Sequence, residues 1–165
     1  MISPPNRHAA PILVLGIGNR LMTDDAAGPI AIERLAGADL PGTRVIDGGT
    51  CGLTLLPEIE ACSGLIVIDA AQIGAEPGTV RVVEGTAMDA LMRGPKQTAH
   101  EVALCDLLDA AACTTGRPAL RALVAIQPGR VAVGYDPTPA IAAAIPAVCD
   151  AVRATLARWQ KEEAA

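Results

Sequence analysis

Three short apolar runs that each lead to aspartate constrain the fold of this chain more than any other feature. The run ILVLGI precedes a loop with Asp24 and Asp25, the run RVI leads into Asp47, and the run LIVI leads into Asp69. All three are short, rich in Val, Ile and Leu, and close to Gly or Pro. This pattern is typical of strands that are buried on both faces of a parallel sheet.

Segments with a helical pattern separate these runs, so the sequence predicts an α/β fold. The expected strands cover residues 12–17, 44–46, 65–68, 79–83 and 122–126, and the expected helices cover residues 26–35, 53–61, a segment that begins at Thr98, and 136–161 with a kink at Pro146. Strands that alternate with helices predict a three-layer α/β/α sandwich around a mostly parallel, twisted sheet of about five strands. We expect residues 1–11 to form a mobile tail and residues 12–165 to form a single domain.

Two of these helices have clear start signals. Thr98 and Glu101 match a capping box, and Asp136 followed by Pro137 matches an N-cap with proline in the first turn. The helix that follows Thr98 also carries an apolar stripe that suits a core-facing side, formed by Val102, Leu104, Leu107, Leu108 and Ala111.

Composition argues against several classes of protein. Hydrophobic residues make up 51% of the chain, which argues against disorder. The net charge is -5 and no Lys/Arg cluster is present, which argues against nucleic acid and anionic membranes as partners. No uninterrupted apolar segment has the length expected for a bilayer span. The five cysteines include no CxxC pair and no secretory signal precedes them, which predicts reduced thiols in the cytoplasm.

The aspartates are placed where chemistry is expected. In an open α/β sheet, ligands bind in the crevice outside the carboxyl ends of the strands. Carboxylates are costly to bury there unless a cation lies among them. His100 stands at the second position of a predicted helix, where the helix dipole favours a neutral, ligating imidazole. Two carboxylates and one imidazole suit a divalent first-row ion, so the pattern indicates a metal or cationic site.

Structural roles account for some of the same residues. Asp24 or Asp25 can cap the helix that follows, although a cap needs only one of them. Asp47 can brace the turn at Gly48 through its carboxylate. Asp69 is harder to explain in this way, because it follows the most apolar run of the chain and needs a partner when buried.

Two other chemistries are weaker alternatives. Gly16 and Gly18 follow a strand, as in a dinucleotide site, but the third glycine position holds Leu21 and the aspartates downstream would repel a pyrophosphate. Cys51 could be a nucleophile, but no base remains to activate it if His100 binds metal. The chain has no GxSxG motif for a serine nucleophile.

Four segments stand in a characteristic order and spacing: GIGNRLMTDDAAGP, VIDGGTCGLTLL, LIVIDAAQIGAEPGTVRV and TAHEVALCDLL. Together they resemble the hydrogenase maturation proteases, the endopeptidases that finish the large subunit of nickel-iron hydrogenases. The resemblance implies an α/β/α sandwich and an enzyme that cuts a short C-terminal extension from the large-subunit precursor after nickel has been installed.

The resemblance also implies roles for particular residues. The family's metal-contacting acid in the first loop aligns with Asp25, its second acid with Asp69 and its histidine with His100. The acid before the double glycine aligns with Asp47, which we take as the candidate general base, with Asp24 as a further catalytic candidate. The resemblance implies nickel that is carried by the substrate, with zinc or cadmium able to replace it in vitro. The implied partner is the large-subunit precursor in the cytoplasm, and we expect the protein itself to be a monomer.

Two departures from the family pattern and two rival functions accompany this interpretation. Asp25 stands where the family often has Glu, and Ala26 stands where it often has Gly. One rival is a Rossmann-like nucleotide-dependent enzyme, which predicts thermal stabilisation by NAD. The other is a nickel-sensing chaperone, which predicts metal-dependent binding of the precursor without cleavage.

Overall fold

This computed structural model describes residues 11–50, 52–94 and 99–165, and the side chains of residues 99–102 lie outside that description. The predictions for the tail, for Cys51 and for the capping box at Thr98 and Glu101 therefore fall outside what the structure describes.

The first half of the chain forms β1 (Ile12–Ile17), η2 (Thr23–Ala26), α1 (Ala27–Ala36), β2 (Thr43–Gly49), η3 (Leu53–Leu55), α2 (Leu56–Ala61) and β3 (Gly64–Ala70). The second half forms β4 (Val80–Glu84), α3 (Gly85–Met92), α4 (Ala99–Cys113), β5 (Leu120–Ile126) and α5 (Pro139–Glu163). The elements η2 and η3 are short 3-10 helices.

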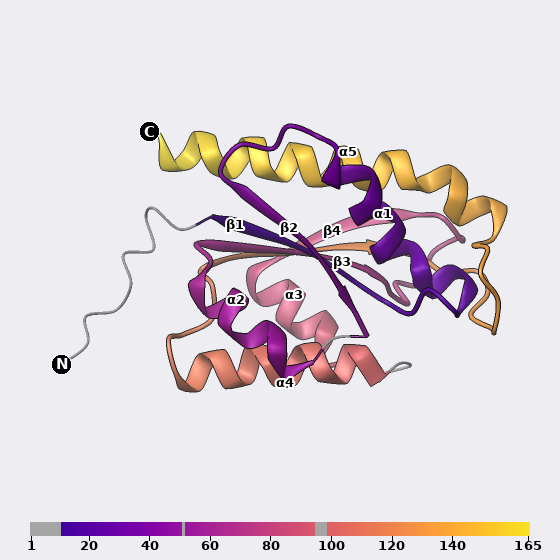
Figure 1. Cartoon of the computed structure of the whole chain (residues 1–165), viewed down its shortest axis with the longest axis horizontal. Helices are drawn as coiled ribbons and strands as arrows, with labels where there is room; N and C mark the ends of the chain where they lie inside the picture. The colour runs from indigo at the N-terminus through magenta and orange to yellow at the C-terminus, as the bar shows by residue number, and fades with distance from the viewer. Residues whose placement is uncertain (1–10, 51, 95–98) are drawn as a thin grey trace.

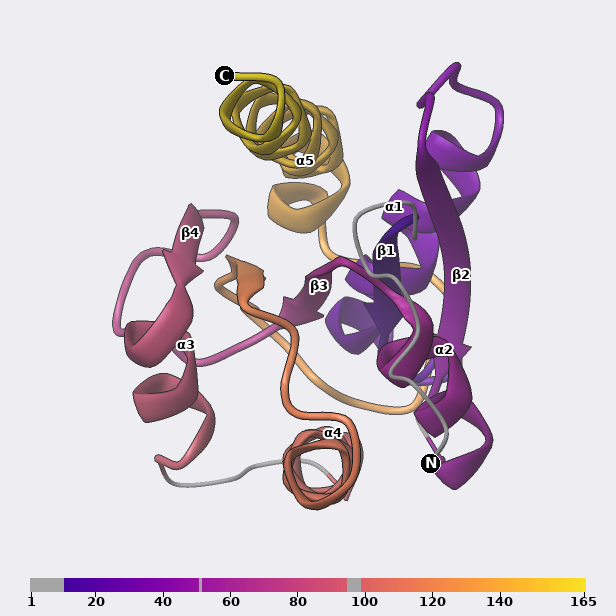
Figure 2. The ribbon, with the colours of Figure 1, turned by 90° about the vertical axis from the view of Figure 1, so that its left-hand side faces the viewer.

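The strands form one sheet in the order β2-β1-β3-β5-β4. Strands β2, β1, β3 and β5 pair in parallel, and β4 pairs with β5 in the antiparallel direction. Helices α1 and α5 lie on one face of the sheet, and α2, α3 and α4 lie on the other (Figures 1 and 2). The predicted sandwich with a mostly parallel five-stranded sheet is confirmed.

Each face of the sheet has its own hydrophobic core. Ile12 and Val14 of β1 pack toward α1 and α5, whereas Leu13 and Leu15 pack toward α2, α3 and α4. Successive side chains of a strand point to opposite faces, so one continuous apolar run supplies both cores. The chain contains no Phe, and aliphatic residues fill most of this space.

Several elements differ from the sequence prediction in extent. Strands β2 and β3 are longer than expected, so Asp47 and Asp69 lie near the carboxyl ends of these strands and not after them. Helix α3 was not predicted. It begins at Gly85, where a positive φ of 55° turns the chain directly after β4. The predicted start of α5 at Asp136 is wrong, because Thr138 is the N-cap.

The predicted stripe of α4 is confirmed at Leu104, Leu107, Leu108 and Ala111, which are all buried. The sequence predicted no segment that could span a bilayer, but α5 is long and apolar enough to do so. Its Ile141, Val148 and Val152 are nevertheless buried against the sheet and α1. We therefore assign α5 as a core helix of this fold.

Candidate active site

The predicted acids converge on the carboxyl end of the parallel strands. Gly16 of β1 pairs with Asp47 of β2 on one side and with Ile68 of β3 on the other. Asp69 therefore lies one residue beyond the level of Asp47, on the opposite side of β1. The segment with Asp25 leaves β1 at this same edge.

Two glycines allow this segment to fold back tightly over the strand ends. A Cβ atom at Gly28 would lie 2.2 Å from the carbonyl oxygen of Ile17 and 2.7 Å from that of Ile68. A Cβ atom at Gly18, where φ is +141°, would lie 1.9 Å from the carbonyl oxygen of Asp25. No side chain fits these spaces, so glycine at both positions lets η2 pack against β3 and the start of α1 pack against β1 and β3.

Asp25 and Asp69 are therefore brought onto contacting elements. Only 3% of either residue is exposed, and η2 packs directly against β3. One carboxylate oxygen of Asp25 accepts the N–H of Asn19 at 2.9 Å, which orients the side chain. Two buried carboxylates at one edge are a donor set that fits a divalent cation.

The third predicted ligand, His100, is the second residue of α4, and its side chain lies outside the described part of the chain. Among the described residues, no group of three His, Cys, Asp or Glu side chains could hold a metal ion. The predicted metal set of Asp25, Asp69 and His100 accordingly stays a prediction, supported by the placement of its two carboxylates.

Asp24 holds the backbone of a distant loop. It is fully buried, and its Oδ2 accepts the N–H groups of Gly129 and Arg130 at 2.8 and 2.7 Å. Thr138 donates its N–H to Oδ1 at 2.6 Å and its hydroxyl to Oδ2 at 3.0 Å. Burial opposes the charged form, but the hydrogen bonds from Thr138, Arg130 and Gly129 outweigh burial and keep the pKa of Asp24 below its usual value. These contacts favour a structural role over the predicted catalytic one.

Neither Asp24 nor Asp25 caps a helix through its side chain. The N-cap of η2 is Met22, the N-cap of α1 is Ala26, and neither makes a side-chain capping bond. The capping interpretation of the aspartate pair is therefore wrong. The observed partners of Asp24 lie more than a hundred positions away, beyond the reach of local sequence patterns.

Asp47 is the accessible acid of the site, with 37% of its side chain exposed. Its Oδ1 accepts the N–H of Gly49 at 2.9 Å, which confirms the predicted bracing of the turn. Its Oδ2 accepts bonds from Nε and Nη2 of Arg20 at 3.2 and 2.9 Å. The other terminal nitrogen of Arg20 pairs with Glu33 at 2.7 Å.

Arg20 is a site residue that the sequence analysis missed. Its hydrogen bond to Asp47 is the main cause that raises the pKa of the guanidinium, against the opposing effect of desolvation. The sequence did contain a signal for this role: Arg20 lies in the loop directly after β1, close to the strand ends that carry aspartates. The guanidinium holds the Asp47 carboxylate in one orientation at the rim of the site.

The alternative of a dinucleotide site gains no support, and the alternative of Cys51 as a nucleophile lies outside the described residues. A Cβ atom at Gly16 would lie 2.6 Å from the carbonyl oxygen of Gly28. Gly16 and Gly18 therefore face the protein's own backbone and leave no room for a pyrophosphate. Cys62 and Cys149 are buried, as expected for core residues, and burial raises the pKa of the Cys149 thiol.

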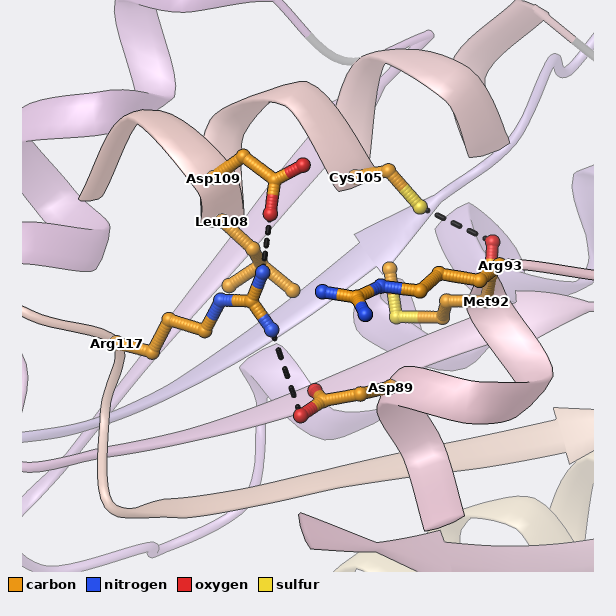
Figure 3. Close-up of a pocket in the computed structure, with 7 residues that line it drawn as sticks. All are labelled: Asp89, Met92, Arg93, Cys105, Leu108, Asp109 and Arg117. Atoms are coloured by element: carbon orange, nitrogen blue, oxygen red, sulfur yellow. Dashed lines mark hydrogen bonds and ion pairs between the residues drawn. The ribbon is translucent and has the colours of Figure 1, made fainter. Parts of the chain in front are cut away.

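A small cavity of about 30 Å³ lies between α3 and α4, and its described lining includes none of the four predicted aspartates (Figure 3). Asp89 of α3 accepts bonds from Arg121 at 2.9 and 2.7 Å and pairs with Arg117 at 3.4 Å. Arg117 also pairs with Asp109 of α4. Arg117 therefore links α3 to α4, and the bond from Arg121 of β5 is the main cause that lowers the pKa of Asp89.

Comparisons with known proteins agree with this geometry. A family model described as "Hydrogenase maturation protease" matches residues 30–155. The hydrogenase expression/formation protein HupD of Rhodobacter capsulatus is 37% identical over 146 residues, which cover 86% of this chain and 70% of that protein. The hydrogenase 2 maturation protease of Escherichia coli is 34% identical over 148 residues, which cover 88% and 90%.

Solved structures show the same relationship. The hydrogenase maturating endopeptidase HybD from E. coli superimposes with a TM-score of 0.82 at 32% identity, and the match covers 90% of this chain and 93% of that chain. The family model and the relatives point to one family, and the solved structure shares the fold. The chain therefore belongs to the hydrogenase maturation protease family and is an endopeptidase.

Proposed function

We propose that this endopeptidase removes the C-terminal extension of a nickel-iron hydrogenase large-subunit precursor in the cytoplasm, after nickel insertion. The observation that carries this proposal is the pair of buried carboxylates, Asp25 and Asp69, at the carboxyl edge of the sheet. Carboxylate oxygens on contacting elements are donors that suit a divalent first-row ion. The nickel of the loaded precursor is such an ion.

Recognition of nickel would use Asp25, Asp69 and His100. Carboxylate and imidazole donors suit a divalent first-row ion, and zinc or cadmium would substitute in vitro. Three protein ligands leave open positions for the groups through which the precursor holds its metal. The precursor would bring its nickel to this edge, and a precursor without nickel would dock without that contact.

Hydrolysis needs a base for the attacking water and polarisation of the scissile carbonyl. Asp47 is the best placed base, because its carboxylate is partly exposed at the site and oriented by Arg20. One of its oxygens would take the water proton as the water oxygen attacks the carbonyl carbon. Asp24 is less suitable for this task, because it is fully buried, whereas the side chain of Asp47 is reached by solvent.

The test is the mass of the precursor before and after incubation with the enzyme. Wild-type enzyme should shorten the nickel-loaded precursor and leave the nickel-free precursor intact. Asp25→Asn and His100→Ala should each abolish cleavage, because each removes a ligand, while the melting temperature stays close to that of wild type. Asp39→Asn is the matched control, since Asp39 is exposed and away from the strand ends.

Equal cleavage of loaded and nickel-free precursor would contradict the proposed metal recognition. Binding of loaded precursor without any change in its mass would favour a chaperone. Full activity of His100→Ala would remove the histidine from the ligand set.

A further inference from the structure

Four exposed apolar side chains lie on and beside the loop that connects β5 to α5. Val133 is 86% exposed, Tyr135 80%, Leu21 54% and Val131 43%. We call these four residues the apolar ridge. Large apolar side chains that gather on one exposed surface mark interaction sites more often than singly scattered ones do.

The loop that carries the ridge is held in place by backbone hydrogen bonds. Gly134 donates its N–H to the carbonyl of Leu21 and accepts the N–H of Thr23, both at 2.9 Å. Ala132 donates its N–H to the hydroxyl of Thr23 at 3.0 Å. The even-numbered residues thus bond toward residues 21–24, and Val131, Val133 and Tyr135 alternate with them as the exposed positions.

The ridge is joined to the candidate active site. Asp24 binds the loop at Arg130 and at Thr138, on either side of the ridge residues, and the next residue in the chain is Asp25. The loop and η2 lie side by side at the carboxyl edge of the sheet, at the right-hand end of Figure 1. The ridge therefore lies beside the segment that carries Asp25.

We propose that the apolar ridge binds an extended, apolar stretch of the precursor's C-terminal segment and holds it beside Asp25 and Asp69 during cleavage. This inference rests on the proposed function. Among the described residues, no backbone hydrogen bond involves Val131 or Val133, so their N–H and C=O groups are available to an extended chain. Aromatic and aliphatic side chains supply the contact area for alternate side chains of such a chain.

The charges beside the ridge favour a polypeptide over a membrane. Arg130 and Asp136 are both exposed at the ends of the ridge segment and balance each other. An anionic lipid surface attracts clusters of basic residues, and the ridge has no such cluster.

The proposal is tested with the double variant Val133→Ser/Tyr135→Ser and nickel-loaded large-subunit precursor. The KM for the precursor should rise about tenfold, which corresponds to about 1.4 kcal/mol of lost binding, while kcat stays within about twofold, because no group at the strand ends changes. Val82→Ser is the control, since Val82 is 37% exposed on the edge strand β4, away from the site. The control should keep the wild-type KM.

Competition identifies the part of the precursor that binds. A synthetic peptide with the sequence of the removable extension and its flanking residues should inhibit the wild-type enzyme at least about tenfold better than the double variant. Equal inhibition of both, or an unchanged KM in the double variant, would overturn the role of the ridge while leaving cleavage intact. Failure of wild-type enzyme to cleave any precursor would instead overturn the proposed function.

A second copy of this chain or a lipid surface on the ridge would give different results. If the ridge joined two copies of this chain, the wild-type protein would sediment as a dimer and the double variant as a monomer. If it bound lipid, the wild-type protein would pellet with phosphatidylglycerol vesicles and the double variant would not. Either result with an unchanged KM would overturn the proposal.

Discussion

Asp24 and Asp25 are adjacent in sequence, and their carboxylates have different partners. Asp24 is surrounded by hydrogen-bond donors from a distant loop, whereas Asp25 takes the N–H of Asn19 and lies beside the end of β3. Both are buried, and burial alone would not separate them. The partners separate them: the first carboxylate maintains the shape of the site, and the second is the one that the proposed function assigns as a ligand.

Asp24→Asn should lower the stability of the protein, because the substitution removes hydrogen bonds as well as a charge. The amide that replaces one oxygen presents donors to the N–H groups of Gly129, Arg130 or Thr138, so at least one bond to a buried group is lost. We expect a loss of about 2–4 kcal/mol in the free energy of unfolding. Urea unfolding measures it, and Asp39→Asn, at an exposed position, should change the value by less than about 0.5 kcal/mol.

The same variant tests how the contribution of Asp24 to stability depends on pH. The pKa of Asp24 is lowered in the folded state, so its contribution is present above the usual value of 3.8. That contribution is lost as the pH falls through the lower folded-state pKa. The stability difference between wild type and Asp24→Asn should therefore be constant near neutral pH and shrink in acid. A difference that grows below pH 3.8 would contradict this assignment.

At the scale of elements, the decisive contact is the approach of α1 to the ends of β1 and β3. Gly28→Ala adds a Cβ atom into a space bounded by the carbonyl oxygens of Ile17 and Ile68. Alanine is the better helix former by about 1 kcal/mol. We nevertheless expect a net destabilisation of about 1–3 kcal/mol, because backbone must move to admit the methyl group.

Gly37→Ala is the matched control for this prediction. Gly37 ends the same helix in a right-handed conformation, and nothing lies within 4 Å of its added Cβ. Thermal melting of both variants makes the comparison. Equal stability of Gly28→Ala and Gly37→Ala would show that α1 does not need its close approach to the strands.

The sequence predicted those parts of the fold that depend on local pattern. The apolar runs marked all five strands, and the acids after them marked the edge where Asp47 and Asp69 lie. Apart from the gathering of the aspartates at this edge, contacts between distant segments were not predicted. The bond between Thr138 and Asp24 belongs to this class, as do the ion pair of Arg20 with Asp47 and the antiparallel pairing of β4. Each depends on which residues meet in space, and no local pattern records that.

For the whole molecule, the two hydrophobic cores share the same strands. Leu65 and Val67 of β3 face one core, and Ile66 and Ile68 face the other. Loss of either core exposes the strands that support the other one. Unfolding should therefore be a single cooperative transition.

Trp159 provides the measurement, because it is the single tryptophan of the chain and 1% of it is exposed. Its emission should shift to longer wavelength when α5 leaves the sheet. The urea midpoint from fluorescence should coincide with the midpoint from far-UV circular dichroism, which also reports the helices on the opposite face. Separate midpoints would mean that the α5 layer unfolds by itself, and Trp159→Phe should abolish the fluorescence change.

The hydrogen bonds of Asp24 to the loop before α5 also set an order of assembly during synthesis. Asp24 and Thr138 are separated by 114 positions. A chain that is still being translated holds Asp24 well before it holds the loop that binds it, and contacts between distant segments are slow to form. The edge of the sheet reaches its working shape only when residue 138 has left the ribosome, so a nascent chain shorter than this remains inactive as a peptidase.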